Sequence, residues 1–265
     1  MPKLIVVGSG IKSISHLTEE TKRVIQNADK VLYLCNEDNL KQWIQKEARC
    51  SESLDSIYFS SEQRIDAYQA ITDHIIEEYA KVSILCVVFY GHPTVFADSA
   101  LNAVKQIKKD GGEAVILPAV SAQDCLFSDL EMDPGDRGCF SIEATELVLF
   151  ERKIDVHSHL MLWQVANFGR TDGKKANKLS ILKDYLCGYY PTDFSICLYE
   201  ASCLPTLLPR IEWILLSNLD KSVINPITTV YIPPLEEKVI SSKYLKLLNL
   251  TVEDLTPKGT KQING

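Results

Sequence analysis

Short apolar runs alternate with amphipathic stretches through the first part of the chain. The runs at 4–7, 30–35, 84–90 and 113–118 predict buried strands, whereas the stretches at 18–27, 39–48, 60–81 and 98–111 have the spacing of helices. Strands that alternate with helices are typical of a largely parallel sheet covered on both faces. We therefore expect an N-terminal α/β domain over residues 1–117.

The pattern changes after Pro118, where strands follow one another with fewer helices between them. This pattern predicts a second α/β domain with a mixed sheet over 118–240, and then a short helix (243–249) and polar tail within 241–265. The expected strands of the second domain cover 159–165, 195–201, 210–219 and 228–234, and its expected helices cover 121–130 and about 177–189.

Charge and composition narrow the possible partners. The net charge is -7 without a block of basic residues, so we do not expect a nucleic-acid partner. No apolar run reaches the roughly 18 residues that span a membrane, and the chain begins directly with a strand, which favours a cytoplasmic protein without a membrane partner. None of the eight cysteines forms a C-x-x-C pair, and we expect all of them to be reduced.

Two short motifs could indicate other kinds of site. The turn "VVGSG" contains Gly8 and Gly10 but lacks the third glycine of a dinucleotide fingerprint, so it is better explained as a glycine turn at the ligand edge of another α/β sheet. His157 and His159 have a spacing that would suit a metal on a strand. Because no cysteine or third histidine lies nearby, the start of a strand is the better interpretation, and we expect no metal.

The helix predicted at 60–81 carries the clearest chemical signal. Arg64 and Tyr68 share a face with Ile71 and Ile75, and Tyr58 lies six residues before Arg64. Burying an arginine is costly unless a partner or ligand compensates its charge, which makes a functional role one interpretation. Periodicity alone gives more weight to the other interpretation, in which Arg64 reaches solvent and Tyr68 only fills the core.

A tight loop follows the strand at 84–90, in the segment "FYGHP". In a parallel sheet this loop lies at the carboxyl edge, where it could hold a ligand, hold a metal or simply turn the chain.

Several segments together resemble the tetrapyrrole methylase superfamily, and most closely its borosin peptide α-N-methyltransferases. They include "LIVVGSGIKSISHLTEETKRVIQNADKVLYL", "FYGHPTVF", "VSAQDCLFSDLEMDP", "GCFSIEATEL", "HSHLMLWQV", "LYEA" and "TTVYIPP", and they cover about residues 4–250. The resemblance implies that S-adenosyl-L-methionine binds in a cleft between two α/β domains. It also implies iterative methylation of backbone amide nitrogens in a ribosomally made precursor peptide.

The resemblance assigns roles residue by residue. Arg64 and Tyr68 match a catalytic pair, and Tyr58 matches an upstream active-site tyrosine. Three residues depart from the family pattern: Thr94 replaces a glycine, Ala119 lies where the linker has Pro-Gly-Val, and Asp55 replaces a tyrosine of some members. The implied cofactor contacts are Tyr90, His92, Val95, Phe96, Ser121, Ala122, Gln164, Ala201, Thr228 and Thr229, and we add Gly8 and Gly10 from the first glycine turn.

Backbone N-methylation gives an independent reason for these residue types. A peptide N–H is a weak acid and a poor nucleophile because its lone pair is delocalised into the carbonyl. A tyrosinate can remove the proton, and an arginine can lower the phenol pKa and stabilise the oxygen that becomes negative. We expect Tyr68, or alternatively Tyr58, to be the base and Arg64 to hold the oxyanion, with S-adenosyl-L-homocysteine as the product.

The resemblance also bears on partners. Many fungal borosin enzymes carry their precursor fused at the carboxyl terminus, whereas this sequence stops about thirty residues after "YIPP" without a Val/Ile/Gly-rich core peptide. We therefore expect a split form that receives its precursor in trans, as a homodimer or as a heterotetramer with the precursor. The alternatives are a methylase of tetrapyrroles or other small molecules, and a non-catalytic module that binds a cofactor or peptide.

Overall fold

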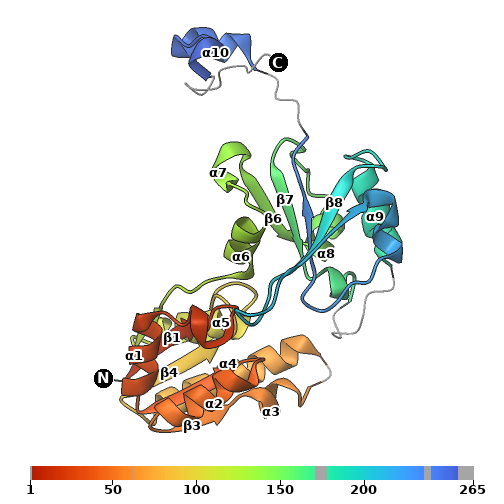
Figure 1. Cartoon of the computed structure of the whole chain (residues 1–265). Helices are drawn as coiled ribbons and strands as arrows, with labels where there is room; N and C mark the ends of the chain where they lie inside the picture. The colour runs from red at the N-terminus through yellow and green to blue at the C-terminus, as the bar shows by residue number, and fades with distance from the viewer. Residues whose placement is uncertain (1, 62, 171–177, 236–239, 256–265) are drawn as a thin grey trace.

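The protein consists of two α/β units, each built on a five-stranded sheet (Figure 1). The computed structural model describes residues 2–61, 63–170, 178–235 and 240–255. The first sheet ends with β5 (Glu113–Ile116), and the second unit begins with α6 (Ala122–Asp129), so the chain passes between the units within this short segment. The boundary at 117/118 stays a prediction that agrees with this arrangement.

The N-terminal sheet is entirely parallel, as the sequence predicts, with the order β3-β2-β4-β1-β5. Its apolar central strand β4 lies between β1 and β2 and is almost completely buried. Because all carboxyl ends meet at one edge, the loops after β1, β2 and β4 are neighbours. The strands are β1 (Lys3–Gly8), β2 (Lys30–Leu34), β3 (Ser51–Ser53), β4 (Ile84–Phe89) and β5.

Helices cover both faces of this sheet, which confirms the predicted layering. Ile71 and Ile75 of α4 pack with Leu85 on one face, and Ile25 of α1 and Ile44 of α2 contribute to the core on the other. Thr18 starts α1 because its side chain accepts a hydrogen bond from the Thr21 N–H. The helical elements are η1 (Ser13–His16), α1 (Glu19–Asn27), α2 (Asp38–Glu47), α3 (Asp55–Tyr58), α4 (Arg64–Tyr79) and α5 (Asp98–Lys109).

The C-terminal sheet is mixed, again as predicted, with the order β6-β7-β10-β8-β9. Strands β6 and β7 are parallel, whereas β10 pairs antiparallel with β7 and β8, and β9 pairs antiparallel with β8. The strands are β6 (Cys139–Glu143), β7 (His159–Trp163), β8 (Ser195–Glu200), β9 (Arg210–Leu215) and β10 (Thr229–Ile232). After α6, the helical elements are α7 (Pro134–Arg137), α8 (Ala144–Leu149), η2 (Val165–Asn167), α9 (Leu179–Cys187), η3 (Leu216–Lys221), α10 (Ser242–Leu248) and η4 (Glu253–Leu255).

Several elements differ from the sequence prediction. Strand β3 and helix α3 were not predicted, because "SES" has no apolar signal and α3 is a single turn. Strand β6 and helix α8 are also additional, since their apolar residues alternate only loosely. The strand predicted at 210–219 ends at Leu215, where the chain turns into η3. The helix predicted at 60–81 covers only Arg64–Tyr79.

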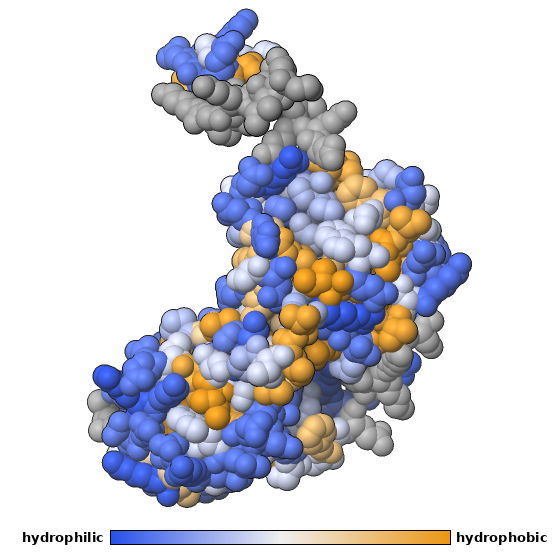
Figure 2. All heavy atoms as spheres, in the orientation of Figure 1, coloured by the Kyte–Doolittle hydropathy of each residue, from blue (hydrophilic) through white to orange (hydrophobic). Residues whose placement is uncertain are grey.

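Figure 2 shows apolar side chains gathering where the two units meet, while the outer surface of the N-terminal unit is mostly hydrophilic. Helix α10 lies apart from both sheets and has no buried residue (Figure 1). All eight cysteines are free, as expected. His159 does begin a strand, and its ring lies 2.8 Å from the Tyr231 hydroxyl. Within the described ranges, no helix has the length and apolar character needed to cross a bilayer.

Candidate active site

A cavity of about 530 Å³ lies where the two units meet, at the carboxyl edge of the parallel sheet. Its lower wall comes from the loops after β2 and β4 and from helices α3 and α4. Its upper wall comes from the ends of β7 and β8, the start of α6 and the loop before β10. The predicted site residues that line it are Tyr58, Arg64, Tyr68, Tyr90, His92, Val95, Phe96, Ser121, Ala122, Gln164, Ala201, Thr228 and Thr229.

Gly8 and Gly10 do not line this cavity; they shape the loop after β4 from behind. The backbones of Gly10 and Gly91 exchange two hydrogen bonds of 3.1 Å, and both residues have positive φ (69° and 71°). A Cβ atom at Gly8 would lie 2.2 Å from the Gly91 carbonyl oxygen. Glycine is therefore required at Gly8 because the two loop backbones touch there.

Thr94, one of the three residues that depart from the family pattern, contacts His92. Its backbone N–H donates to His92 Nδ1 at 3.3 Å, and its hydroxyl lies 2.9 Å from the same atom. Because Nδ1 accepts, a neutral His92 carries its proton on Nε2. The threonine therefore fixes the histidine tautomer without closing the cavity, which His92 still lines.

Two residues on opposite walls have left-handed backbone. Phe96 has a φ of 53° and Gln164 a φ of 57°, a conformation that non-glycine residues adopt only at a cost. The ring of Phe96 packs against Trp163 with centroids 6.1 Å apart, so the two walls touch beside the cavity. Trp163 and Gln164 belong to the "LMLWQV" segment that carries part of the family resemblance.

Arg64, the first residue of α4, reaches across to the C-terminal unit. Its Nη1 donates to Gln164 Oε1 at 3.3 Å, and its Nη2 donates to Asn167 Oδ1 at 2.8 Å. The sequence argument required a partner for this arginine, and the structure supplies two uncharged amide oxygens. Asn167 was missed, although it lies in the same "WQVAN" segment, only three residues after the predicted contact Gln164.

Tyr68 and Tyr58 lie side by side near Arg64. Their ring centroids are 6.2 Å apart and their ring planes are inclined by 30°, with Tyr58 at the end of α3 and Tyr68 one turn into α4. Burial raises the pKa of Tyr68, and the neighbouring Tyr58 adds to this effect, so that together they outweigh the opposing charge of Arg64. Arg64 does lower the phenol pKa, as expected, but the net effect of all neighbours is a raised pKa.

Tyr90 belongs to a different chemical environment in the same cavity. Burial raises the pKa of its phenol to about 12. This phenol is protonated at neutral pH and can offer a ring contact and a hydrogen-bond donor.

The cavity also contains an ion pair that the sequence did not indicate. Lys41 Nζ lies 2.7 Å from Asp55 Oδ2, and both residues line the cavity with Tyr58. Asp55 is one of the departures from the family pattern, so the Lys41–Asp55 ion pair takes the place of the tyrosine that some members have here. Its signal in the sequence was only the position of Asp55 shortly before Tyr58.

Comparison with known proteins shows the family of the chain. Residues 3–172 match the family model described as Tetrapyrrole (Corrin/Porphyrin) Methylases. The chain belongs to the tetrapyrrole methylase family. Two solved structures share its fold: uroporphyrin-III-C-methyltransferase from Thermus thermophilus (TM-score 0.62, 17% identity, 87% of this chain and 92% of the other) and the methyltransferase CobJ (TM-score 0.63, 13% identity, 91% of this chain and 98% of the other).

Relatives within the family resemble this methylase along nearly its whole length. The methyltransferase/gymnopeptides precursor of Gymnopus fusipes is 34% identical over 96% of this chain and 62% of the relative. The methyltransferase/omphalotin A precursor of Omphalotus olearius is 31% identical over 93% and 61%, respectively. The chain therefore spans about three fifths of these relatives, and the names of the relatives join a methyltransferase and a precursor in one polypeptide rather than in a split form.

Proposed function

We propose that this protein transfers methyl groups from S-adenosyl-L-methionine to backbone amide nitrogens of a ribosomally made peptide, iteratively. The observation that carries the proposal is the cluster of Arg64, Tyr68 and Tyr58 at one end of the cavity between the units. The similarity to relatives whose names join a methyltransferase with a cyclic-peptide precursor supports a peptide substrate.

The residues of the cavity fit such a cofactor. A volume of about 530 Å³ is within the usual size of small-molecule sites. Tyr90, Phe96 and Trp163 provide aromatic surfaces, which suit both an adenine ring and a sulfonium cation. When bound, S-adenosyl-L-methionine would supply an activated methyl group, and the chain's own residues would prepare the amide.

Arg64 and Tyr68 divide the preparation of the amide between them. The Arg64 guanidinium would donate hydrogen bonds to the amide oxygen as negative charge develops there. The Tyr68 phenolate would accept the proton from the amide nitrogen, with Tyr58 as the alternative base. Because the pKa of Tyr68 is raised, its reactive form is scarce at neutral pH, but a phenolate formed there is a stronger base.

Gln164 and Asn167 would keep the guanidinium aimed at the substrate. Their amide oxygens accept from two different Arg64 nitrogens, which restricts rotation of the planar group. Asn167 is itself buried, with 8% exposure, so its side chain is a firm support. Positioning of this kind lowers the entropic cost of reaching the reactive geometry.

A mass-spectrometric assay tests the proposal. The precursor segment of the Gymnopus fusipes relative would be supplied as a separate peptide with S-adenosyl-L-methionine. We expect mass gains in multiples of one methyl group, and fragmentation should place them on backbone nitrogens. The double variant Arg64→Ala/Tyr68→Phe is the matched control and should bind the cofactor without methylating. Methyl groups found on side chains, or a wild-type protein that binds no cofactor in calorimetry, would contradict the proposal.

The arrangement of substrate and subunits is part of the same proposal. Delivery of the precursor in trans, the homodimer and the heterotetramer stay predictions. The first is checked by the assay above, because methylation of a separate peptide is its direct consequence. The subunit arrangement is checked by light scattering of the protein alone and with that peptide.

A further inference from the structure

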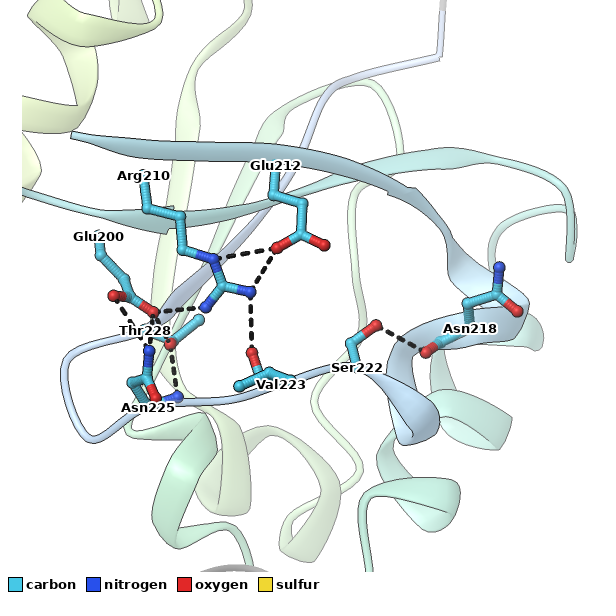
Figure 3. Close-up of polar contacts among 8 residues, drawn as sticks. All are labelled: Glu200, Arg210, Glu212, Asn218, Ser222, Val223, Asn225 and Thr228. Carbon is cyan, nitrogen blue, oxygen red and sulfur yellow. Dashed lines mark hydrogen bonds and ion pairs between the residues drawn. The ribbon is translucent and has the colours of Figure 1, made fainter. Parts of the chain in front are cut away.

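One wall of the cavity is held by a polar network centred on Glu200, the last residue of β8 (Figure 3). Its carboxylate accepts hydrogen bonds from Arg210 Nη1 at 2.6 Å and from Thr228 Oγ1 at 2.5 Å. Asn225 Nδ2 donates to both carboxylate oxygens, at 3.0 and 3.3 Å. Two segments of the C-terminal unit, strand β9 and the loop before β10, thus converge on one largely buried carboxylate.

The hydroxyl group of Thr228 is fully engaged in this network. It donates its single proton to Glu200 and accepts the Asn225 backbone N–H at 2.8 Å. The Thr228 N–H in turn donates to the Asn225 carbonyl at 3.0 Å, which closes a compact turn. A hydroxyl has only one proton, so Thr228 cannot donate a hydrogen bond to a ligand in this arrangement.

Arg210 extends the network to the start of the loop. Its Nη2 donates to the Val223 carbonyl at 2.9 Å, and its Nε donates to Glu212 at 3.0 Å. The guanidinium therefore ties β9 to both Glu200 and the backbone that leads into Asn225 (Figure 3). Between these fixed points lie Pro226 and Ile227, which line the cavity beside Thr228.

We propose that Glu200 and Arg210 are positioning residues that set the cavity wall at 226–228 and thereby the affinity for the cofactor. This inference rests on the proposed function. Neither residue is among those that line the cavity, so both act through the loop. Thr228 serves the site by its place in the wall rather than by a hydroxyl hydrogen bond to the ligand.

The charge of Glu200 is essential to the argument. Its side chain is 13% exposed, and burial by itself opposes ionisation. Hydrogen bonds from Thr228, Arg210 and Asn225 outweigh burial and lower the pKa of Glu200, so the group is a carboxylate at neutral pH. A glutamine at this position would place N–H donors against other donors, and one or more of the contacts would be lost.

Calorimetric titration with S-adenosyl-L-homocysteine tests the proposal through four variants. Glu200→Gln should weaken binding about tenfold, because a charge-assisted contact to the loop is lost. Thr228→Val, which keeps the shape but removes the hydroxyl, should weaken binding similarly. Thr228→Ser retains the hydroxyl and should bind much more tightly than Thr228→Val, with nearly the wild-type affinity. Glu212→Gln is the matched control, since Glu212 pairs with Arg210 but contacts neither Thr228 nor Asn225 in the network.

The double variant Glu200→Gln/Thr228→Val should bind no more weakly than either single variant, because both remove the same connection. In steady-state kinetics of Glu200→Gln, KM for the cofactor should rise while kcat at saturating cofactor stays close to the wild-type value. Additive losses, or a Glu212→Gln variant as weak as Glu200→Gln, would overturn the positioning role. If the wild-type protein binds the ligand and Glu200→Gln binds it equally well, the positioning role is overturned but the proposed function is not. A wild-type protein that does not bind the ligand would overturn the proposed function as well.

Discussion

One arginine, Arg64, lines the cavity and another, Arg210, lies behind its wall, and the two differ in their partners. Arg64 is held by the amide oxygens of Gln164 and Asn167, whereas Arg210 is held by the carboxylates of Glu200 and Glu212. Amide oxygens orient a guanidinium but leave its charge uncompensated, and carboxylates largely cancel it. The first arrangement suits a group that must stabilise new negative charge, and the second suits a structural tie. The partner set thus indicates the role better than the residue type does.

The largest expected effect would come from the Arg64 end of the cavity. Tyr68→Phe and Arg64→Ala should each lower kcat about 10²- to 10⁴-fold, because one removes the proposed base and the other removes the proposed oxyanion donor. Arg64→Lys keeps the charge but loses the two-armed contact and should recover only a small part of the rate. Wild-type rates of peptide methylation in both Tyr68→Phe and Arg64→Ala would refute the assignment of these two residues.

Asn167 offers a direct test of the charge argument. Asn167→Ala removes one support of Arg64 and should slow methylation about tenfold, whereas Asn167→Asp should slow it about 100-fold because it neutralises the guanidinium. The aspartate forms the stronger contact, so a purely structural role would give the opposite order. Rates of single-turnover methylation decide between the two orders, and cofactor binding serves as the control for folding.

The pH dependence sharpens the role of Tyr68. Its pKa is raised by burial, so the phenolate fraction and the rate should increase about tenfold per pH unit from about pH 7 to about pH 10. Asn167→Asp adds a negative charge beside Arg64, which weakens the lowering of the Tyr68 pKa by that arginine, and should move this rise to still higher pH. A flat profile of single-turnover rate over the same range would show that Tyr68 is not the base.

The smallest expected effect is on thermal stability, through the network of Glu200 and Arg210, and it depends on pH. The lowered pKa of Glu200 means that its contribution to stability is fully present above the unfolded-state pKa of about 4.3 and is lost as pH falls through the folded-state value. The melting temperature of Glu200→Gln should therefore lie about 2–4 °C below wild type at neutral pH, and the gap should close in acid. A gap that is independent of pH would contradict the ionised network.

Much of the fold could be predicted from the apolar pattern of the sequence. The prediction was more complete for the strands of the N-terminal sheet than for those of the C-terminal sheet. The parallel strands β1, β2 and β4 are continuous apolar runs and could be predicted directly. Strand β6 could not, because intermediate burial along its length leaves no strong period in the sequence. Hydrophobic periodicity detects elements that face a core, and it is weak for short elements at the rim.

The site shows the same limit. Arg64 and Tyr68 attracted notice because an arginine on an apolar helix face needs an explanation, and the family resemblance then assigned them roles. The structure places both at the cavity. Asn167, Glu200 and Arg210 were missed because their roles depend on contacts between segments far apart in the chain, which spacing along one element cannot indicate. Those contacts arise only when the loops of the sheets converge.

The left-handed backbone of Gln164 shows what this position demands. Asparagine and glycine adopt positive φ more readily than glutamine does, so backbone preference alone would favour either of them. A glycine has no side chain, and an asparagine is one methylene shorter, so neither could span the 3.3 Å contact to Arg64 from the same backbone. The length of the Gln164 side chain, which reaches Arg64, therefore matters more at this position than an unstrained backbone. Substitution by glycine or asparagine would relieve the backbone strain but would remove the contact to the guanidinium.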